Sequence, residues 1–485
     1  MDRESRLLRA ERKRRKCAKN PPDCDNVLFY CFRDDMIAKA RAFFKGKGIR
    51  LSTLDRWHEK YGFTYPWSGD YSDLRQNVNR QFVYFPMIIA MCESEHAVKR
   101  ALQVSVKLQL HVAIRGGSHC MEPFSLGNGT IIDQSRRKKI RTRGTAVSVE
   151  PGAVLGEVVS HLCDRNLIMA VGSCPNVGMG YFLGGGVGFY DRTFGAGCDQ
   201  LKEAKILLAS GDTLMVSEEK HRDLLWALRG AGCGNFGIVL SLTFRACKTP
   251  DDFYLYKMTY PLDDLPVVLP LWQRWSWEAD DRLGAEFRFN NGGSRPLISG
   301  IFFGPREELE RGLSIFPQKG REDYCVKRTT FAEAGEEFAG KGRWPPFTKA
   351  KNSFIDQYLP PAAFPIIIKY MRGGNGLSVF ELNTLGGAFN RPAPTDTAFC
   401  HRGSKMWMLI NAHWDTQDGG PSELEWLNSF SAEMAPFTNG MLYQNMPDLT
   451  VPRAMEKYYG PNLPRLRSLK QKYDPDNVFN YAQSV

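Results

Sequence analysis

Two short glycine-rich segments constrain the fold of this chain more than any other feature. They are residues 114–119, Ile-Arg-Gly-Gly-Ser-His, and residues 172–180, Gly-Ser-Cys-Pro-Asn-Val-Gly-Met-Gly. Glycine lets a backbone approach a neighbouring group closely and adopt dihedral angles that other residues avoid. Each segment also presents one nucleophile, His119 or Cys174, of a kind that can form covalent adducts. The two segments therefore predict loops that hold a flat cofactor or a diphosphate.

Short β-branched runs and amphipathic stretches alternate around these segments. Residues 93–109 have helical spacing of apolar side chains, with Ser94 as a suitable N-cap, and residues 154–165 have a similar pattern. Three short runs are typical of strands: 111–114, 130–133 and 146–149. The pattern predicts an α+β domain in which both glycine segments lie on loops at strand ends, where cofactors commonly bind.

After residue 250 the chain changes to proline-punctuated stretches that are rich in Trp and Phe. Four runs there alternate as antiparallel strands do: 286–290, 297–303, 379–382 and 406–413. We expect an antiparallel sheet with helices over one face. Near the C-terminus, the pattern predicts a helix over 463–472 and a last strand over 478–481.

A Gly-x-Gly-x-x-Gly string at residues 232–237 is similar to a dinucleotide-binding fingerprint, but its surroundings oppose that interpretation. Residues 223–229 have a helical pattern and residues 238–244 a strand pattern, which reverses the order of a Rossmann turn. The chain has no Walker A lysine, no His-Glu-x-x-His motif and no Cys-x-x-Cys pair among its twelve cysteines. We therefore predict neither a Rossmann site nor a metal site.

The positive charge of the chain is concentrated at its N-terminus. The first twenty residues hold nine Lys or Arg against three acidic residues, which is +6 of the formal net charge of +11. Such a basic arm can contact nucleic acid or another polyanion through residues 3–19, act as a nuclear-import signal, or remain a solvated tail. No apolar run approaches the roughly 18 residues of a membrane helix, and the N-terminus lacks the apolar stretch of a secretory signal. These features predict no membrane span and an intracellular protein, with the nucleus or a nucleic-acid package as alternatives.

Six ordered blocks between residues 115 and 239 resemble FAD-linked oxidases of the berberine bridge enzyme type, within the vanillyl-alcohol oxidase superfamily. The blocks are Arg115-x-x-x-His119, Ile132-Asp133, Cys174-Pro-x-Val177-Gly178, residues 184–188 with Arg192 and Gly195, residues 223–230, and residues 234–239. The tail is similar to the same family in Tyr458-Tyr-Gly-x-Asn462, and its Tyr443-x-Asn445-x-x-Asp448 pattern is more similar to the carbohydrate oxidases. The chain departs from the family at Ser118, where a glycine usually precedes the histidine.

The resemblance implies an α+β fold with a PCMH-type FAD-binding domain over residues 70–250, completed by residues 450–485. Residues 251–449 would form the substrate-binding domain, residues 21–69 an N-terminal extension and residues 1–20 the arm. FAD would be attached twice, by His119 to the flavin 8α-methyl carbon and by Cys174 to C6. The other FAD contacts that the resemblance implies are Arg115, Gly116, Gly117, Ser118, Val177, Gly178, Gly180, Gly184, Gly188, Gly234, Asn235, Gly237, Ile238, Tyr481 and Gln483.

Tyr458 matches the family's tyrosine base, which removes a hydroxyl proton of the substrate while hydride passes to flavin N5. The small Val177 matches a position over the flavin that admits dioxygen, so an oxidase is favoured over a dehydrogenase. The predicted substrate contacts are His401, Asn411 and His413.

The resemblance thus implies an FAD-dependent oxidase that converts a hydroxyl-bearing small molecule, first of all a sugar or oligosaccharide, and releases hydrogen peroxide from dioxygen. Two alternatives stay open. One is oxidative cyclisation of an alkaloid-like or terpenoid-like substrate, and the other is a structural protein that holds nucleic acid with its basic arm. The sequence predicts no particular oligomeric state.

Overall fold

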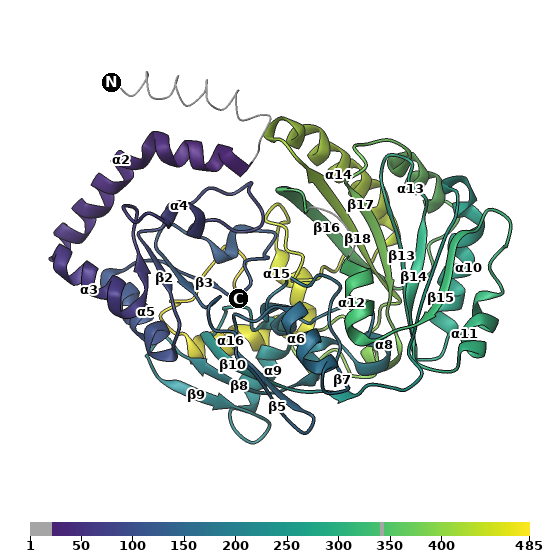
Figure 1. Cartoon of the computed structure of the whole chain (residues 1–485), viewed down its shortest axis with the longest axis horizontal. Helices are drawn as coiled ribbons and strands as arrows, with labels where there is room; N and C mark the ends of the chain where they lie inside the picture. The colour runs from purple at the N-terminus through teal and green to yellow at the C-terminus, as the bar shows by residue number, and fades with distance from the viewer. Residues whose placement is uncertain (1–21, 340–343) are drawn as a thin grey trace.

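The computed structural model describes residues 22–339 and 344–485. The first half of the chain carries a four-stranded, a five-stranded and a two-stranded sheet, a seven-stranded sheet follows in the second half, and the C-terminal helices return to the first half (Figure 1). Helices and antiparallel sheets both occur, so the predicted α+β class is confirmed. The predicted nucleic-acid contact of residues 3–19 lies outside the described residues.

A four-stranded sheet carries the first glycine segment. In spatial order its strands are β1 (Phe63–Thr64), β2 (Ile88–Met91), β4 (Thr130–Asp133) and β3 (Val112–Arg115). Strands β2, β4 and β3 are parallel, and β1 pairs with β2 in the antiparallel sense. Helix α5 (Glu95–Leu108) packs on this sheet, and Ser94 caps it by accepting a hydrogen bond from the Ala97 amide at 3.2 Å. The helices that precede β2 are α2 (Pro22–Gly46), α3 (Leu51–Tyr61) and α4 (Tyr71–Leu74).

An antiparallel five-stranded sheet supports the second glycine segment. Its spatial order is β5 (Ile140–Arg143), β6 (Ala146–Val149), β10 (Ile238–Arg245), β8 (Leu201–Leu207) and β9 (Thr213–Val216). Helix α9 (Arg222–Ala231) comes before the glycine string at residues 232–237 and β10 after it, so the predicted reversal of the Rossmann order is confirmed. The other elements of this part are α6 (Leu155–Cys163), α7 (Gly180–Leu183), α8 (Asp191–Phe194), and the pair β7 (Leu167–Ile168) with β11 (Cys247–Lys248).

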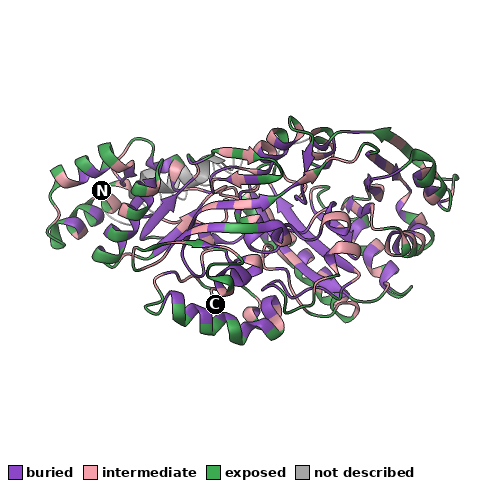
Figure 2. Ribbon diagram, turned by 90° about the horizontal axis from the view of Figure 1, so that it is seen from below, coloured by how far each residue is buried: buried purple, intermediate pink, exposed green. Residues whose placement is uncertain are grey.

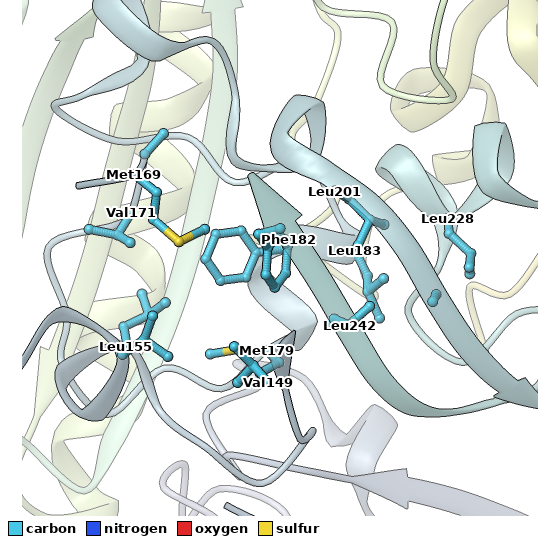
Figure 3. Close-up of a cluster of buried hydrophobic side chains, with 14 of the residues drawn as sticks. Val149, Leu155, Met169, Val171, Met179, Phe182, Leu183, Leu201, Leu228 and Leu242 are labelled. Carbon is cyan, nitrogen blue, oxygen red and sulfur yellow. The ribbon is translucent and has the colours of Figure 1, made fainter. Parts of the chain in front are cut away.

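The second glycine segment is anchored in a hydrophobic core. Met179 within the segment and Phe182 just after it are buried among side chains from α6, β6, β8 and β10 (Figure 3). The Phe182 ring lies 4.4 Å from that of Phe244 on β10. Because buried side chains are packed to near-crystalline density, this core fixes where the loop with Cys174 emerges.

The second half forms a fully antiparallel seven-stranded sheet. Its spatial order is β15 (Glu322–Arg328), β12 (Tyr254–Thr259), β14 (Leu297–Phe302), β13 (Leu283–Asn290), β17 (Val379–Thr384), β18 (Met406–Trp414) and β16 (Phe347–Ile355). All four strands that the sequence predicts here are present, and β12, β15 and β16 are additional. Apolar side chains of one face pack under helices α10 (Leu265–Glu278), α11 (Arg306–Leu313), α13 (Ala363–Arg372) and α14 (Gly420–Met434). Figure 2 shows this buried layer and the exposed outer sides of the helices. Helix α12 (Phe331–Ala339) packs instead on α6 of the first half.

The C-terminal segment returns to the first half as α15 (Ala454–Tyr459) and α16 (Leu463–Tyr473). The predicted final strand over residues 478–481 is wrong, because no strand forms there. The Asp474 carboxylate accepts hydrogen bonds from the amides of Val478 and Phe479, both at 2.9 Å. A side chain thus satisfies the backbone donors that a neighbouring strand would otherwise have paired.

Candidate active site

A large cavity of about 1110 Å³ lies between the loops of the first half and the uncovered face of the seven-stranded sheet. Both glycine segments, side chains of β13, β17 and β18, and residues near the C-terminus form its wall. Typical ligand pockets measure roughly 300–1,000 Å³. The cavity therefore has room for a cofactor together with a small substrate.

The two glycine segments touch each other along this wall. A Cβ atom on Gly117 would lie 2.5 Å from the Gly178 nitrogen, and one on Gly178 would lie 2.6 Å from the Gly117 nitrogen. A Cβ on Gly116 would lie 2.7 Å from the carbonyl oxygen of Pro151. Only glycine permits this backbone contact, which brings residues about sixty positions apart onto one surface.

His119 and Cys174 meet where the two segments join. The Nε2 atom of His119 lies 3.3 Å from the Sγ atom of Cys174. Burial lowers the pKa of the His119 imidazole, so the ring is neutral and a ring nitrogen keeps its lone pair. Burial raises the pKa of the Cys174 thiol, against the opposing effect of the Asn176 and Val177 amides. The predicted pair of nucleophiles is thus brought together on one wall of the cavity.

Most of the other predicted cofactor and substrate residues line the same cavity. They are Gly116, Gly117, Ser118, Val177, Gly178, Gly180, Gly188, Gly234, Gly237, Asn411, His413, Tyr458, Tyr481 and Gln483. Five predicted residues do not line it: Arg115, Gly184, Asn235, Ile238 and His401.

Two of these five brace the wall from behind. Arg115 pairs with Asp133 and donates hydrogen bonds to the carbonyl groups of Leu74 and Gln76. The Asn235 side chain accepts a hydrogen bond from the Val485 amide at 2.9 Å, which ties the end of the chain to the glycine string. Their positions indicate structural support of the cavity wall.

The structure does not place His401 at the cavity. Its ring stacks on Phe354 with centroids 4.1 Å apart, and burial lowers its pKa to about 3. A neutral, packed imidazole at this position is part of the core. The predicted substrate contact of His401 therefore has no support from its surroundings.

Tyr458 lies at the C-terminal side of the cavity in a ring of hydrogen bonds. Its hydroxyl donates to Gln483 Oε1 at 3.0 Å and accepts from the Asp448 amide at 3.1 Å. The Gln483 amide donates in turn to the Asp448 carbonyl at 2.7 Å. Burial raises the pKa of the Tyr458 phenol, and the charges of Asp448 and Glu122 raise it further.

The sheet contributes a row of charged and amide side chains that the sequence analysis does not predict. Glu286 and Arg288 on β13 line the cavity opposite Asn383 and Glu381 on β17. The alternation Glu-Phe-Arg-Phe-Asn over residues 286–290 is the signal, because every second residue of a strand faces the same side. Burial raises the pKa of Glu286 well above its ordinary value, and the Glu381 carboxylate adds to this. Neighbouring Lys257 is held at 2.6 Å by Glu337.

His413 and Asn411 continue the polar wall on β18. The Asn411 Oδ1 atom accepts a hydrogen bond from the Thr348 hydroxyl at 2.8 Å. His413 Nδ1 is buried and has no hydrogen-bond partner within residues 22–339 and 344–485. The Trp344 ring lies edge-on to both His413 and His119, at 5.1 and 5.4 Å between centroids. The Trp344 ring and the imidazole of His413 thus lie together on the cavity wall.

Among the described residues, no group of three or more His, Cys, Asp or Glu side chains is arranged to hold a metal ion. A search of the same part of the chain finds no helix with the length and apolar character needed to cross a membrane.

Comparison with known proteins agrees with this architecture. The family "Berberine and berberine like" matches residues 442–485, and "FAD binding domain" matches residues 86–217. The FAD-linked oxidoreductase YgaK of Bacillus subtilis is 34% identical over 429 residues, which cover 86% of this chain and 94% of that protein. The chain belongs to the berberine-like FAD-linked oxidoreductases.

Two further proteins show the range of this family. The chitooligosaccharide oxidase of Gibberella zeae is 27% identical over 440 residues, covering 84% of this chain and 88% of its own length. The solved structure of the D396N variant of BBE-like 1 from Physcomitrella patens shares the fold, with a TM-score of 0.82 and 24% identity. That match covers 89% of this chain and 98% of the moss protein.

The cavity of this FAD-linked oxidoreductase fits the cofactor of its family. Gly116, Gly117 and Gly178 line the cavity with backbone and no side chain, which is the kind of surface that lets a flat cofactor or a diphosphate come close. The hydroxyl group of Tyr181, on the same wall, is buried without a hydrogen-bond partner in the described part of the chain. Because buried polar groups are nearly always satisfied, this hydroxyl is available to a bound polar group.

Proposed function

We propose that this protein is an FAD-dependent oxidase of a hydroxyl-bearing small molecule, first of all a sugar or oligosaccharide, with dioxygen as electron acceptor and hydrogen peroxide as product. One observation carries the proposal: a single cavity joins the His119–Cys174 pair to the polar face of the seven-stranded sheet. The chitooligosaccharide oxidase relative supports the substrate class.

FAD would be held covalently by His119 and Cys174, with the glycine strip and Tyr481 around it. FAD, when bound, supplies a two-electron acceptor that dioxygen can reoxidise. The neutral imidazole of His119 and the adjacent thiol of Cys174 suit covalent attachment, because neither the ring nitrogen nor the sulfur takes part in an ion pair. Residues 70–250 with 450–485 would form the FAD-binding part, and residues 251–449 the substrate-binding part.

The substrate would lie against the sheet. Carboxyl, guanidinium and amide groups of Glu286, Arg288 and Asn383 supply both donors and acceptors, which a ring with several hydroxyl groups requires. Trp344 would offer an apolar face to the ring. Tyr458 would take the hydroxyl proton at its phenolic oxygen, and the small Val177 would leave space for dioxygen.

The covalent link is tested by precipitating the purified protein in acid and measuring flavin absorbance in the pellet. We expect the wild-type pellet to be yellow, His119→Ala and Cys174→Ala each to retain FAD through the remaining bond, and the double variant to release it. Cys233→Ala, another cysteine of the cavity wall, is the matched control and should retain FAD. Release of FAD from the wild-type protein would disprove the covalent assignment.

The reaction is tested by peroxide release during incubation with neutral oligosaccharides, amino sugars, and alkaloid or terpenoid alcohols. We expect peroxide with at least one carbohydrate, and little with Tyr458→Phe. Turnover confined to alkaloids or terpenoids would favour oxidative cyclisation. Absence of flavin reduction by every compound would contradict the oxidase assignment.

A further inference from the structure

A group of buried charges behind the cavity wall joins three segments that are far apart in the sequence. Lys349 on β16 forms ion pairs with Glu122, three residues after His119, and with Asp448 Oδ1, the latter at 2.7 Å. Lys351 pairs with the other carboxylate oxygen of Asp448. The side chains of Lys349, Glu122 and Asp448 are 11%, 1% and 3% exposed, and none of them lines the cavity.

This charged group controls the backbone that contacts Tyr458. Asp448 presents its amide to the phenolic oxygen, and the next amide, that of Leu449, donates to Glu122 Oε1 at 3.2 Å. Lys349 holds both carboxylates, so it fixes the backbone at residues 448 and 449 from two sides. The position of the Tyr458 hydroxyl therefore depends on an ammonium group that does not touch it.

The same ammonium group balances the charge around Tyr458. Glu122 and Asp448 carry two negative charges, and Lys349 and Lys351 carry two positive ones. Burial opposes the ionisation of Asp448, but hydrogen bonds and charges from the two lysines lower its pKa to about 2. Glu122 has no ion-pair partner other than Lys349 among the described residues. Without Lys349, uncompensated negative charge would therefore face the phenol.

The cysteine, tyrosine and histidine side chains packed around Tyr458 are neutral near pH 7. Burial raises the pKa of Cys120 to about 11 and that of Cys400 to about 12, and it also raises the pKa of Tyr459. Burial lowers the pKa of His401 to about 3. On helix α15 itself, Glu456 pairs with Arg453, and Lys457 is half-buried.

We propose that Lys349 is a positioning residue for Tyr458: it holds the Asp448 amide on the phenolic oxygen and supplies the positive charge that lets this tyrosine ionise beside two carboxylates. The inference rests on the proposed function, in which Tyr458 accepts the substrate proton. A base acts when it is deprotonated, so the rate should rise with pH through the pKa of Tyr458. Changes in charge at residues 122 and 349 should move that rise in opposite directions.

The test measures flavin reduction by substrate against pH, without oxygen, for four variants. Lys349→Met should move the rising limb to higher pH, by about one unit, which corresponds to a rate about tenfold lower at a fixed pH on that limb. Glu122→Gln should move it to lower pH, and the double variant should lie near the wild type. Lys349→Arg should restore the wild-type limb. The matched control is Lys457→Met, which should leave the limb in place.

A second readout does not depend on turnover. The protein is labelled with ¹³C at tyrosine Cζ, the Tyr458 resonance is assigned from its loss in Tyr458→Phe, and its movement with pH is followed in each variant. We expect the titration of this resonance to move to higher pH in Lys349→Met and to lower pH in Glu122→Gln, as for the rate. If no compound reduces the flavin but these shifts occur, the oxidase proposal fails and the role of Lys349 stands.

Two results would overturn the role of Lys349. One is a shift of the rising limb of the pH–rate profile in the same direction for Lys349→Met and Glu122→Gln. The other is a Tyr458 resonance whose pH dependence in both variants equals that of the wild type. If Lys349→Met does not fold, Glu122→Gln and the double variant still test the role of Lys349. Glu122→Gln removes a negative charge and should shift the limb to lower pH, whereas the double variant keeps the net charge and should match the wild type.

Discussion

Ser118 holds a backbone conformation that favours glycine. Its φ angle is 57°, in the left-handed region, immediately before His119. A non-glycine residue in this region costs roughly 1–2 kcal/mol, so the loop holds this geometry at some expense in stability. His119 nevertheless remains 3.3 Å from Cys174.

We expect Ser118→Gly to stabilise the protein by about 0.5–1 kcal/mol, because relief of the left-handed strain outweighs the greater freedom of glycine in the unfolded chain. Denaturant unfolding measures the change. Ser118→Ala keeps a Cβ atom in the same conformation and should bring no gain. Equal stability of the two variants would show that the loop carries no such strain.

Two histidines show how little the residue type alone reveals about the role of a side chain. His401 and His413 are both buried histidines with a lowered pKa, yet one stacks on Phe354 and the other faces the cavity. The residue type is the same for the two, although His413 lies on strand β18 and His401 in a loop. Only the neighbours that the fold brings to each ring distinguish a histidine packed in the core from one that lines the cavity.

At the scale of elements, the contact between the two glycine segments leaves no room for a side chain at Gly117 or Gly178. We expect Gly178→Ala to destabilise the protein by about 1–3 kcal/mol, as overpacking usually does, because the added methyl would lie 2.6 Å from the Gly117 nitrogen. Thermal unfolding and retained flavin absorbance measure the effect. The separation of the loops should also reduce the share of protein that carries FAD.

Gly180→Ala is the matched control for this change. A Cβ atom there meets nothing within 4 Å, and the residue begins helix α7, where alanine is favourable. Its stability should lie within about 0.5 kcal/mol of the wild type. Equal losses in the two variants would mean that the close contact between the segments is not what limits residue 178.

At the scale of the whole molecule, the C-terminal segment closes the cavity. Phe479 is 1% exposed in a core shared with α5 and the four-stranded sheet, and it lines the cavity together with Tyr481 and Gln483 just beyond it. We expect Phe479→Ala to cost about 3–5 kcal/mol and to loosen FAD binding, because it removes the anchor of these residues. Unfolding and FAD content are measured together. Exposed Asp476→Ala, three residues earlier, should change neither.

The ion pairs of Asp448 connect the sheet to the C-terminal segment and should make the fold sensitive to acid. The pKa of Asp448 is lowered to about 2 in the folded protein, from an ordinary value of about 4. Its ionisation therefore stabilises the fold above about pH 4, and this contribution is lost as the pH falls towards 2.

We expect the Tm of the wild type to fall more steeply between these pH values than that of Asp448→Asn, which lacks the titrating group. Asp476→Asn, at an exposed position, is the control and should follow the wild type. Parallel curves for Asp448→Asn and the wild type would contradict the linkage.

The sequence by itself determined the features that short stretches carry. The helix after Ser94, the strands at residues 130–133 and 146–149, and the order of α9 and β10 all follow from side-chain periodicity and capping within a few residues. The two glycine segments also predicted a cofactor site, because each has glycine residues and a nucleophilic side chain close together in the sequence.

Only the tertiary structure decided what depends on register and on distant neighbours. It placed Lys349 between Glu122 and Asp448 and moved His401 into the core. These outcomes join residues that are up to 327 positions apart, as the Leu449 amide and Glu122 are. The physical reason is that such contacts are fixed by the packing and strand pairing of the whole sheet, and no local pattern encodes their partner.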